Sequence, residues 1–339
     1  MAHEPGRESK LKERFSYIDR TKGLAILLVV LGHLIARNSP PGAGNEVYLL
    51  IKEGIYAFHM PLFMAVSGLV YGLSWRPGVT ITDDLTDARR RVLRLLPAYF
   101  LIGLLVFVGK LVFQSFTPAV DNRVDSATEL LTLLLRPTDS FCAFLWYIYA
   151  LTILYAAFPL AFRAVQGRIV WLLPVTIAFW WLPTGRWFAW DLLQVLSLFF
   201  VIGVIAGRHH EETQRWLGLL WLPALIGFST LLLAGAYDDP LGHWTTAALS
   251  IVALPGLMRA AEPWHLSLFE TLGRYTLTIY LTNTIFIGLI KVVSFHLGLW
   301  NAADFPVVAV LMTVVAIGGA ILLKRHLLPW APPLDRITT

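Results

Sequence analysis

Long runs of apolar side chains constrain this sequence more than any other feature. They come in blocks of about 18 to 23 residues, the helix length that a hydrocarbon slab about 30 Å thick requires. The 339 residues are 57% hydrophobic and only 14% charged, whereas a water-soluble domain carries about 25% charged residues. We therefore predict an all-α integral membrane protein, a bundle of about ten transmembrane helices. The expected helices are 22–37, 54–74, 94–114, 143–161, 168–183, 190–207, 216–235, 242–259, 271–293 and 304–324.

The distribution of basic residues predicts the orientation of this bundle. If all ten helices span the membrane, 20 of the 27 lysines and arginines fall on the side of the amino terminus. An excess of Lys and Arg marks cytoplasmic loops, so we expect both termini in the cytoplasm of a multi-pass protein of the inner or plasma membrane. The expected organisation is a disordered basic tail over 1–14, a transmembrane domain over 15–330 and a cytoplasmic carboxyl-terminal tail over 331–339.

Charge and cysteine content narrow the classes of partner. The net charge of +5 is a topology signal in a chain of this kind, so we expect the lipid bilayer and no nucleic acid as partner. Cys142 is the only cysteine, which excludes an intramolecular disulfide and a Cys-based metal site. We predict no metal site and no permanently bound cofactor, and the sequence leaves the oligomeric state open.

The first helix carries two ionisable residues, Lys22 and His33, that lie eleven residues apart. At about 100° per residue they fall within about 20° of one face, and about 16 Å apart along the axis. Asp19 lies three residues before Lys22, close enough to pair with it at the inner interface. Ionisable groups inside hydrocarbon are costly and usually face a polar cavity, so His33 is a candidate catalytic residue.

The second helix adds another histidine at similar depth, His59, two residues before Pro61. Proline removes a helical hydrogen bond, so Pro61 is expected to kink this helix and free a carbonyl towards a cavity. Ser67 and Gly68 form a small pair that permits close helix packing. Two histidines on adjacent helices are a stronger signal of a site than either alone.

The segment 75–93 is polar, and its aspartates precede a run of arginines, which predicts a cytoplasmic helix leading into helix 94–114. Arg91 and Arg94 lie three residues apart on one face near its start. Arginine binds phosphate through a two-pronged fork and stays charged at any working pH. Phosphate binding and simple membrane anchoring both fit this pair.

Five motifs resemble the acyltransferase-3 family of membrane proteins, most closely its fucose 4-O-acetylase-like branch. They are Asp19-x-x-Lys22-Gly23 with His33, Phe58-His59-Met60-Pro61-Leu62-Phe63 with Ser67-Gly68, Arg91-x-x-Arg94-Leu95-Leu96-Pro97-Ala98-Tyr99, Leu145-Trp146-Tyr147, and Tyr275-Thr276-Leu277-Thr278-Ile279-Tyr280-Leu281.

The resemblance implies catalytic roles for Lys22 and His33, and an acyl-CoA site at Arg91 and Arg94. Trp146, Tyr147 and Asn283 join Ser67 as candidate cavity residues. This sequence has lysine where arginine is frequent in the family, and Asn283 where many members have histidine, which leaves the role of the ninth helix open.

The implied activity is membrane O-acyl transfer from cytoplasmic acyl-CoA, with acetyl as the expected group, to a hydroxyl of a glycan or lipid-linked sugar. His33 would act as the general base, because an ordinary imidazole pKa of about 6.5 suits it to accept a proton near neutrality. Asp19 and His59 are the other expected catalytic residues. The alternative is a transporter or exporter of a glycan or lipid-linked substrate, which polytopic architecture fits equally well.

Overall fold

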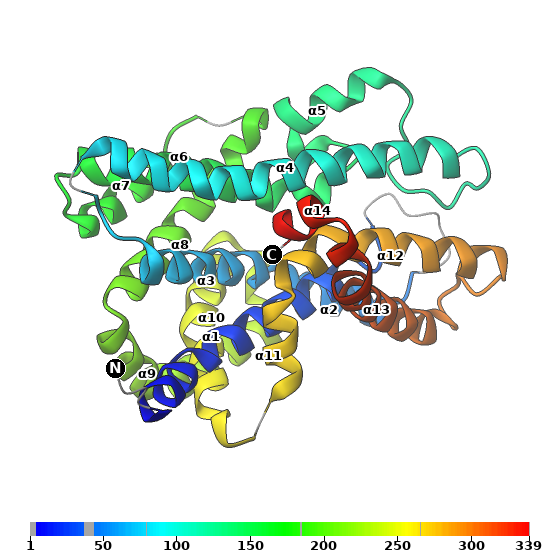
Figure 1. The fold of residues 1–339 in the computed structure, drawn as a ribbon. Coiled ribbons are helices and arrows are strands. Elements are labelled where there is room, and N and C mark those ends of the chain that lie inside the picture. The colour runs from blue at the N-terminus through cyan, green and yellow to red at the C-terminus, as the bar shows by residue number, and fades with distance from the viewer. Residues whose placement is uncertain (1–4, 37–43, 79, 184, 265, 339) are drawn as a thin grey trace.

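The computed structural model describes residues 5–36, 44–78, 80–183, 185–264 and 266–338, and within these ranges the chain forms helices and no strand (Figure 1). Eight helical segments in these ranges are long and apolar enough to cross a membrane. The predicted all-α membrane protein is confirmed. The α-helices are α1 (Pro5–Gly32), α2 (Glu46–Tyr56), α3 (His59–Ser74), α4 (Ile81–Phe113), α5 (Leu130–Leu135), α6 (Trp146–Ala164), α7 (Leu172–Phe179), α8 (Trp190–Arg208), α9 (His210–Leu233), α10 (Pro240–Ala260), α11 (Ser267–Arg274), α12 (Thr276–His296), α13 (Phe305–Leu322) and α14 (Pro332–Ile337).

Two of the ten expected helices form but do not reach the length and apolarity of a full span. The uncharged part of α1 covers only residues 23–32, and the fifth expected helix is the short segment Ile169–Phe179. Helix α1 begins at Pro5, so residues 5–14 are helical and the expectation of a disordered tail there is wrong. Residues 1–4 of that tail, and residue 37 at the end of the first expected helix, lie outside the described residues.

The second expected helix is in fact two helices, α2 and α3, which meet at Ala57 and Phe58. Pro61 lies in the first turn of α3, where the missing N–H of proline costs least. The predicted break is therefore present, although it falls before the proline and not at it. The residues that lead into the third helix are helical, as predicted, and continuous with α4, whose first turn is fixed by a capping box between Thr80 and Asp83.

Glycines permit a very close contact between α3 and α8. A Cβ placed on Gly68 would lie 2.1 Å from the carbonyl oxygen of Phe200, and one on Gly203 would lie 2.0 Å from that of Ala65. Gly72 and Gly207 repeat this arrangement one turn further along the same two helices. Small residues at a four-residue spacing let two backbones touch, so the close packing expected of Gly68 is confirmed.

The carboxyl-terminal end of the chain packs against the bundle. In Figure 1, α4 runs along the upper side of the molecule, and α14 lies between it and α13. The hydroxyl of Thr278 on α12 donates to the carbonyl oxygen of Thr338 at 3.0 Å, and Lys324 pairs with Asp335 at 2.8 Å. Residues 331–338 thus cover one end of α12.

Candidate active site

His33 lies just beyond the end of α1. The helix ends at Gly32, and the N–H of His33 bonds the carbonyl oxygen of Val30 at 3.1 Å, so the chain makes one tight turn there. The expectation that His33 lies within a continuous helix over 22–37 is therefore wrong. A side chain on a turn at a helix end can face a neighbouring helix more directly than one on a helical stripe.

The side chain of His33 is half-buried and meets Asn283 on α12. The His33 Nδ1 atom is 3.2 Å from Asn283 Oδ1, and Asn283 itself is fully buried. The His33 Nε2 atom has no hydrogen-bond partner among the described residues. This leaves one ring nitrogen bonded to the protein and the other available to a substrate.

Helix α2 holds the turn that carries His33. One face of α2 presents three polar side chains at four-residue spacing, and each donates a hydrogen bond to a carbonyl at the end of α1 or just after it. The last carbonyls of a helix have no partner within it, so these bonds satisfy groups that would otherwise be unpaired in an apolar environment. The three bonds are Tyr48 Oη to Leu31 O at 2.9 Å, Lys52 Nζ to Ile35 O at 2.5 Å and Tyr56 Oη to Gly32 O at 3.0 Å.

His59 occupies the first position of α3 and is buried. Its Nδ1 atom lies 2.8 Å from the carbonyl oxygen of Ile55, which can only accept, so Nδ1 carries the proton. The ring packs edge-on against Tyr56, with 5.0 Å between centroids. Because Tyr56 also bonds the residue before His33, the structure brings both histidines to the same region.

Asp19 and Lys22 form the predicted ion pair, with 2.6 Å between carboxylate and ammonium. Between them in sequence, buried Arg20 bonds Glu270 on α11 through two nitrogens, at 2.9 and 2.7 Å. A Cβ on Gly23 would lie 2.0 Å from the carbonyl oxygen of Phe269. The Asp19-x-x-Lys22-Gly23 motif therefore includes a packing glycine and flanks a structural arginine.

Arg91 and Arg94 have different surroundings. The Arg91 guanidinium bonds Asp87 at 2.9 Å, lies within 3.4 Å of the Ser74 hydroxyl and stacks 4.4 Å above the Tyr71 ring. Arg94 is exposed one turn further along α4. Ser74 and His59 are at opposite ends of α3, about 22 Å apart at 1.5 Å per residue. The arginines thus lie near one end of the bundle and the histidines near the other.

Ser67 and Tyr147 belong to a hydrogen-bonded aromatic core. Their hydroxyls are 2.6 Å apart, and Tyr147 stacks on Phe63 with 4.8 Å between centroids. Tyr280 on α12 packs on Tyr147 at 5.5 Å, and its hydroxyl donates to the carbonyl oxygen of Phe144. Half-buried Trp146 packs edge-on against Tyr147 at 6.1 Å. These contacts join α3, α6 and α12, so these motif residues have a packing role.

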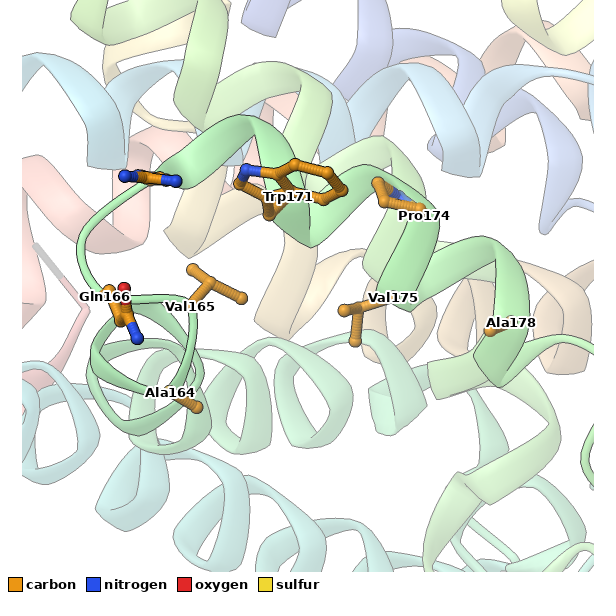
Figure 2. Close-up of a pocket in the computed structure, with 8 residues that line it drawn as sticks. Ala164, Val165, Gln166, Trp171, Pro174, Val175 and Ala178 are labelled. Carbon is orange, nitrogen blue, oxygen red and sulfur yellow. The ribbon is translucent and has the colours of Figure 1, made fainter.

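A groove of about 500 Å³ lies away from all of these residues, between the end of α6 and helix α7. Figure 2 shows Trp171 and Pro174 along one side, with the turn at Val165 and Gln166 facing them. None of the residues proposed from sequence lines this groove. In the described part of the chain, no three His, Cys, Asp or Glu side chains gather so as to hold a metal ion.

Comparison with known proteins identifies the family. A family model described as an acyltransferase domain, that of the acyltransferase-3 family, matches residues 15–325. The chain belongs to the acyltransferase-3 family. It is similar to Nodulation protein NolL of Sinorhizobium fredii, with 29% identity over 202 residues, 57% of this chain and 49% of that protein. The protein of the same name from Mesorhizobium japonicum is 30% identical over 115 residues, 33% of this chain and 30% of its own length.

The match thus spans about half the length of the first of these relatives, and less of the second. No solved structure matches the chain.

Sequence reasoning missed the three α2 side chains that hold the turn of this acyltransferase-3 protein. Their signal was present, because Tyr48, Lys52 and Tyr56 recur every four residues and so share one helix face. The segment was overlooked because Glu46, Lys52 and Glu53 interrupt its apolar character. The expected helix 54–74 therefore begins eight residues after the start of α2 at Glu46.

Proposed function

We propose that this protein is a membrane O-acyltransferase that moves an acyl group, in the first instance acetyl, from cytoplasmic acyl-CoA to a hydroxyl of a glycan or lipid-linked sugar. The observation that carries the proposal is the environment of His33: one ring nitrogen is bonded to Asn283 and the other is available. The family match over residues 15–325 supports acyl transfer as the reaction class.

In the proposed reaction His33 acts as general base. Its Nε2 atom takes the proton of the acceptor hydroxyl as the hydroxyl oxygen attacks the thioester carbonyl carbon. A C–O bond forms and the C–S bond breaks. The leaving thiolate takes the proton back from the imidazolium, so the products are the O-acyl ester, free CoA thiol and neutral His33. Ser67 bonds Tyr147 at 2.6 Å, and no histidine among the described residues hydrogen-bonds it, which favours direct transfer over an acyl-enzyme on this serine.

The proposed donor site is the arginine end of the bundle. Asp87 and the Tyr71 ring hold the Arg91 guanidinium in place, and exposed Arg94 is open to an anion. If the phosphates bind there, the rest of the donor must extend about 22 Å along α3 to bring its acyl thioester to the histidines. Lys22, paired with Asp19, would supply positive charge to the donor and not contact His33.

Two side chains have narrower proposed roles. His59 carries its proton on Nδ1, so its Nε2 atom keeps a lone pair with which we propose it binds the acceptor hydroxyl. Trp146 is half-buried beside the aromatic core and would line the path between the donor and the histidines. We place the protein in the inner or plasma membrane with both termini cytoplasmic, which reporter fusions after Asp121 and Arg208 would test.

The experiment that tests the function is deletion and complementation, with O-acetyl groups on surface glycans read by mass spectrometry. The wild-type gene is expected to restore O-acetylation, and His33→Gln to leave it absent at normal protein abundance, because an amide does not accept a proton near neutral pH. His296→Gln is the matched control, since His296 is exposed at the end of α12. A fully active His33→Gln protein would refute the base and favour the transporter alternative.

A further inference from the structure

We propose that Asn283 is a positioning residue that fixes the tautomer of His33 and aims its Nε2 atom at the acceptor hydroxyl. The effect of Asn283 on catalysis rests on the proposed function, whereas its effect on the tautomer of His33 does not. It gives a role to a fully buried amide whose role the sequence alone leaves open.

The orientation of the Asn283 amide follows from its own bonds. Its Nδ2 atom lies 2.9 Å from the carbonyl oxygen of Ile279 and 2.7 Å from that of Tyr280. Carbonyl oxygens only accept hydrogen bonds, so the NH₂ group must face them and use both of its protons there. The Asn283 side chain is fully buried, which leaves its Oδ1 atom pointing at His33 with no freedom to exchange places with nitrogen.

The tautomer of His33 follows from that orientation. Asn283 Oδ1 carries no proton, so the contact of 3.2 Å is a hydrogen bond only if His33 Nδ1 carries one. In neutral imidazole the proton on Nδ1 leaves the lone pair on Nε2. The opposite tautomer would set two lone pairs against each other at Nδ1 and present a proton, not a base, to the substrate.

The backbone supports the same geometry from the other side of His33. Tyr56 and Tyr48 hold the carbonyls of Gly32 and Leu31, so the backbone of the turn cannot move away from α12 without breaking these bonds. Asn283 therefore meets a ring whose backbone is already placed. Its remaining task is to select which nitrogen is protonated.

The scale of the effect comes from general-base catalysis, which contributes about 10²- to 10⁴-fold to rate. In serine proteases, replacing the aspartate that orients the histidine leaves the wrong tautomer and lowers kcat about 10⁴-fold. We expect Asn283→Leu to lower kcat about 10²-fold or more, with KM for acyl-CoA unchanged. Asn283→Asp keeps an oxygen acceptor towards Nδ1 when its other oxygen carries a proton that bonds the Ile279 or Tyr280 carbonyl, and in that form should retain much of the activity.

The test uses purified full-length protein in lipid nanodiscs, labelled with ¹⁵N in its histidine rings. The His33 signals are assigned by their loss in His33→Gln, and spectra are recorded at alkaline pH, where the rings are neutral. Wild type and Asn283→Asp should show protonated Nδ1 and bare Nε2, whereas Asn283→Leu should show the Nε2-protonated form. Thr282→Val is the matched control, because the hydroxyl of this buried neighbour donates to the Thr278 carbonyl within α12 and has no other side-chain bond among the described residues.

Each outcome is decisive. Unchanged His33 signals in Asn283→Leu would overturn the positioning role, whatever the activity. A changed tautomer with full O-acetylation activity would uphold the positioning role and refute His33 as the base. Loss of activity in Thr282→Val to the same degree as in Asn283→Leu would show a packing effect of α12 and overturn the catalytic half of the inference.

Discussion

We predict opposite effects on stability for two glycine-to-alanine substitutions, one inside the contact between α3 and α8 and one outside it. Gly68 faces the α8 backbone, and the Cβ of an alanine there would lie 2.1 Å from the Phe200 carbonyl oxygen. Gly288 on α12 has open space, with nothing within 4 Å of such an atom. Both residues lie inside membrane-spanning helices, so Gly68→Ala and Gly288→Ala are a matched pair that differ in packing alone.

The magnitude follows from that distance. A carbon next to a carbonyl oxygen needs about 3.3 Å, so α3 and α8 must separate by about 1.2 Å to admit the Gly68→Ala methyl group. Overpacking of this kind costs about 1 to 3 kcal/mol, against a gain of about 1 kcal/mol from the better helix propensity of alanine. We expect Gly68→Ala to lower the free energy of unfolding by up to about 2 kcal/mol, and Gly288→Ala to leave it unchanged or raise it by up to about 1 kcal/mol.

The assay is unfolding of the purified protein in mixed micelles by sodium dodecyl sulfate, followed by tryptophan fluorescence. A shift of α3 by about 1 Å would also displace His59 and the donor path, and misplacement of that size costs about 10²-fold in rate. O-acetylation of surface glycans should therefore fall in Gly68→Ala and not in Gly288→Ala. Equal unfolding free energies for the two variants would refute the close-packing argument.

Three further predictions concern the site. Tyr56→Phe removes the bond to the Gly32 carbonyl. It should lower O-acetylation about 10-fold or more and lower the free energy of unfolding by about 1 kcal/mol. Unchanged O-acetylation in glycan mass spectrometry would contradict this prediction. Because Arg94 is exposed, Arg94→Ala should leave the stability of the free protein unchanged. It should weaken CoA binding about 10- to 100-fold, the loss expected for one charge-assisted phosphate contact. Melting temperatures measured with and without added CoA test both expectations. Lys22→Arg should keep activity and Lys22→Ala lose it in the same glycan assay, because the position is proposed to supply charge.

The sequence predicted the positions of the spanning helices well where length and apolarity alone decide them. The sixth expected helix, 190–207, differs from α8 by one residue at its end. Hydrocarbon imposes this result, because a buried backbone must satisfy its own hydrogen bonds over the full thickness of the bilayer. Helix α2 was not predicted because polar residues interrupt its apolar pattern. Both ends of α1 differ from the expected helix 22–37.

Most of the site contacts could not be predicted, because they join residues far apart in the chain. His33 and Asn283 are 250 residues apart, and so are Arg20 and Glu270. Periodicity describes which residues share a helix face, but it carries no information on which distant face lies opposite. The Asp19–Lys22 pair was predictable because its two members are on the same helix.

Motif residues in one chain do not share one role, and the structure separates them by their contacts. Gly23, Phe63, Tyr147 and Tyr280 pack helices together, whereas His33 has a ring nitrogen with no protein partner among the described residues. Packing and chemistry nevertheless depend on each other here. Tyr280 and Asn283 lie three residues apart on α12. The aromatic core that holds Tyr280 therefore also fixes the position along the helix axis at which the Asn283 amide meets His33. Motifs that only pack are therefore expected to lower activity when they are changed, and a loss of activity alone does not identify a catalytic residue.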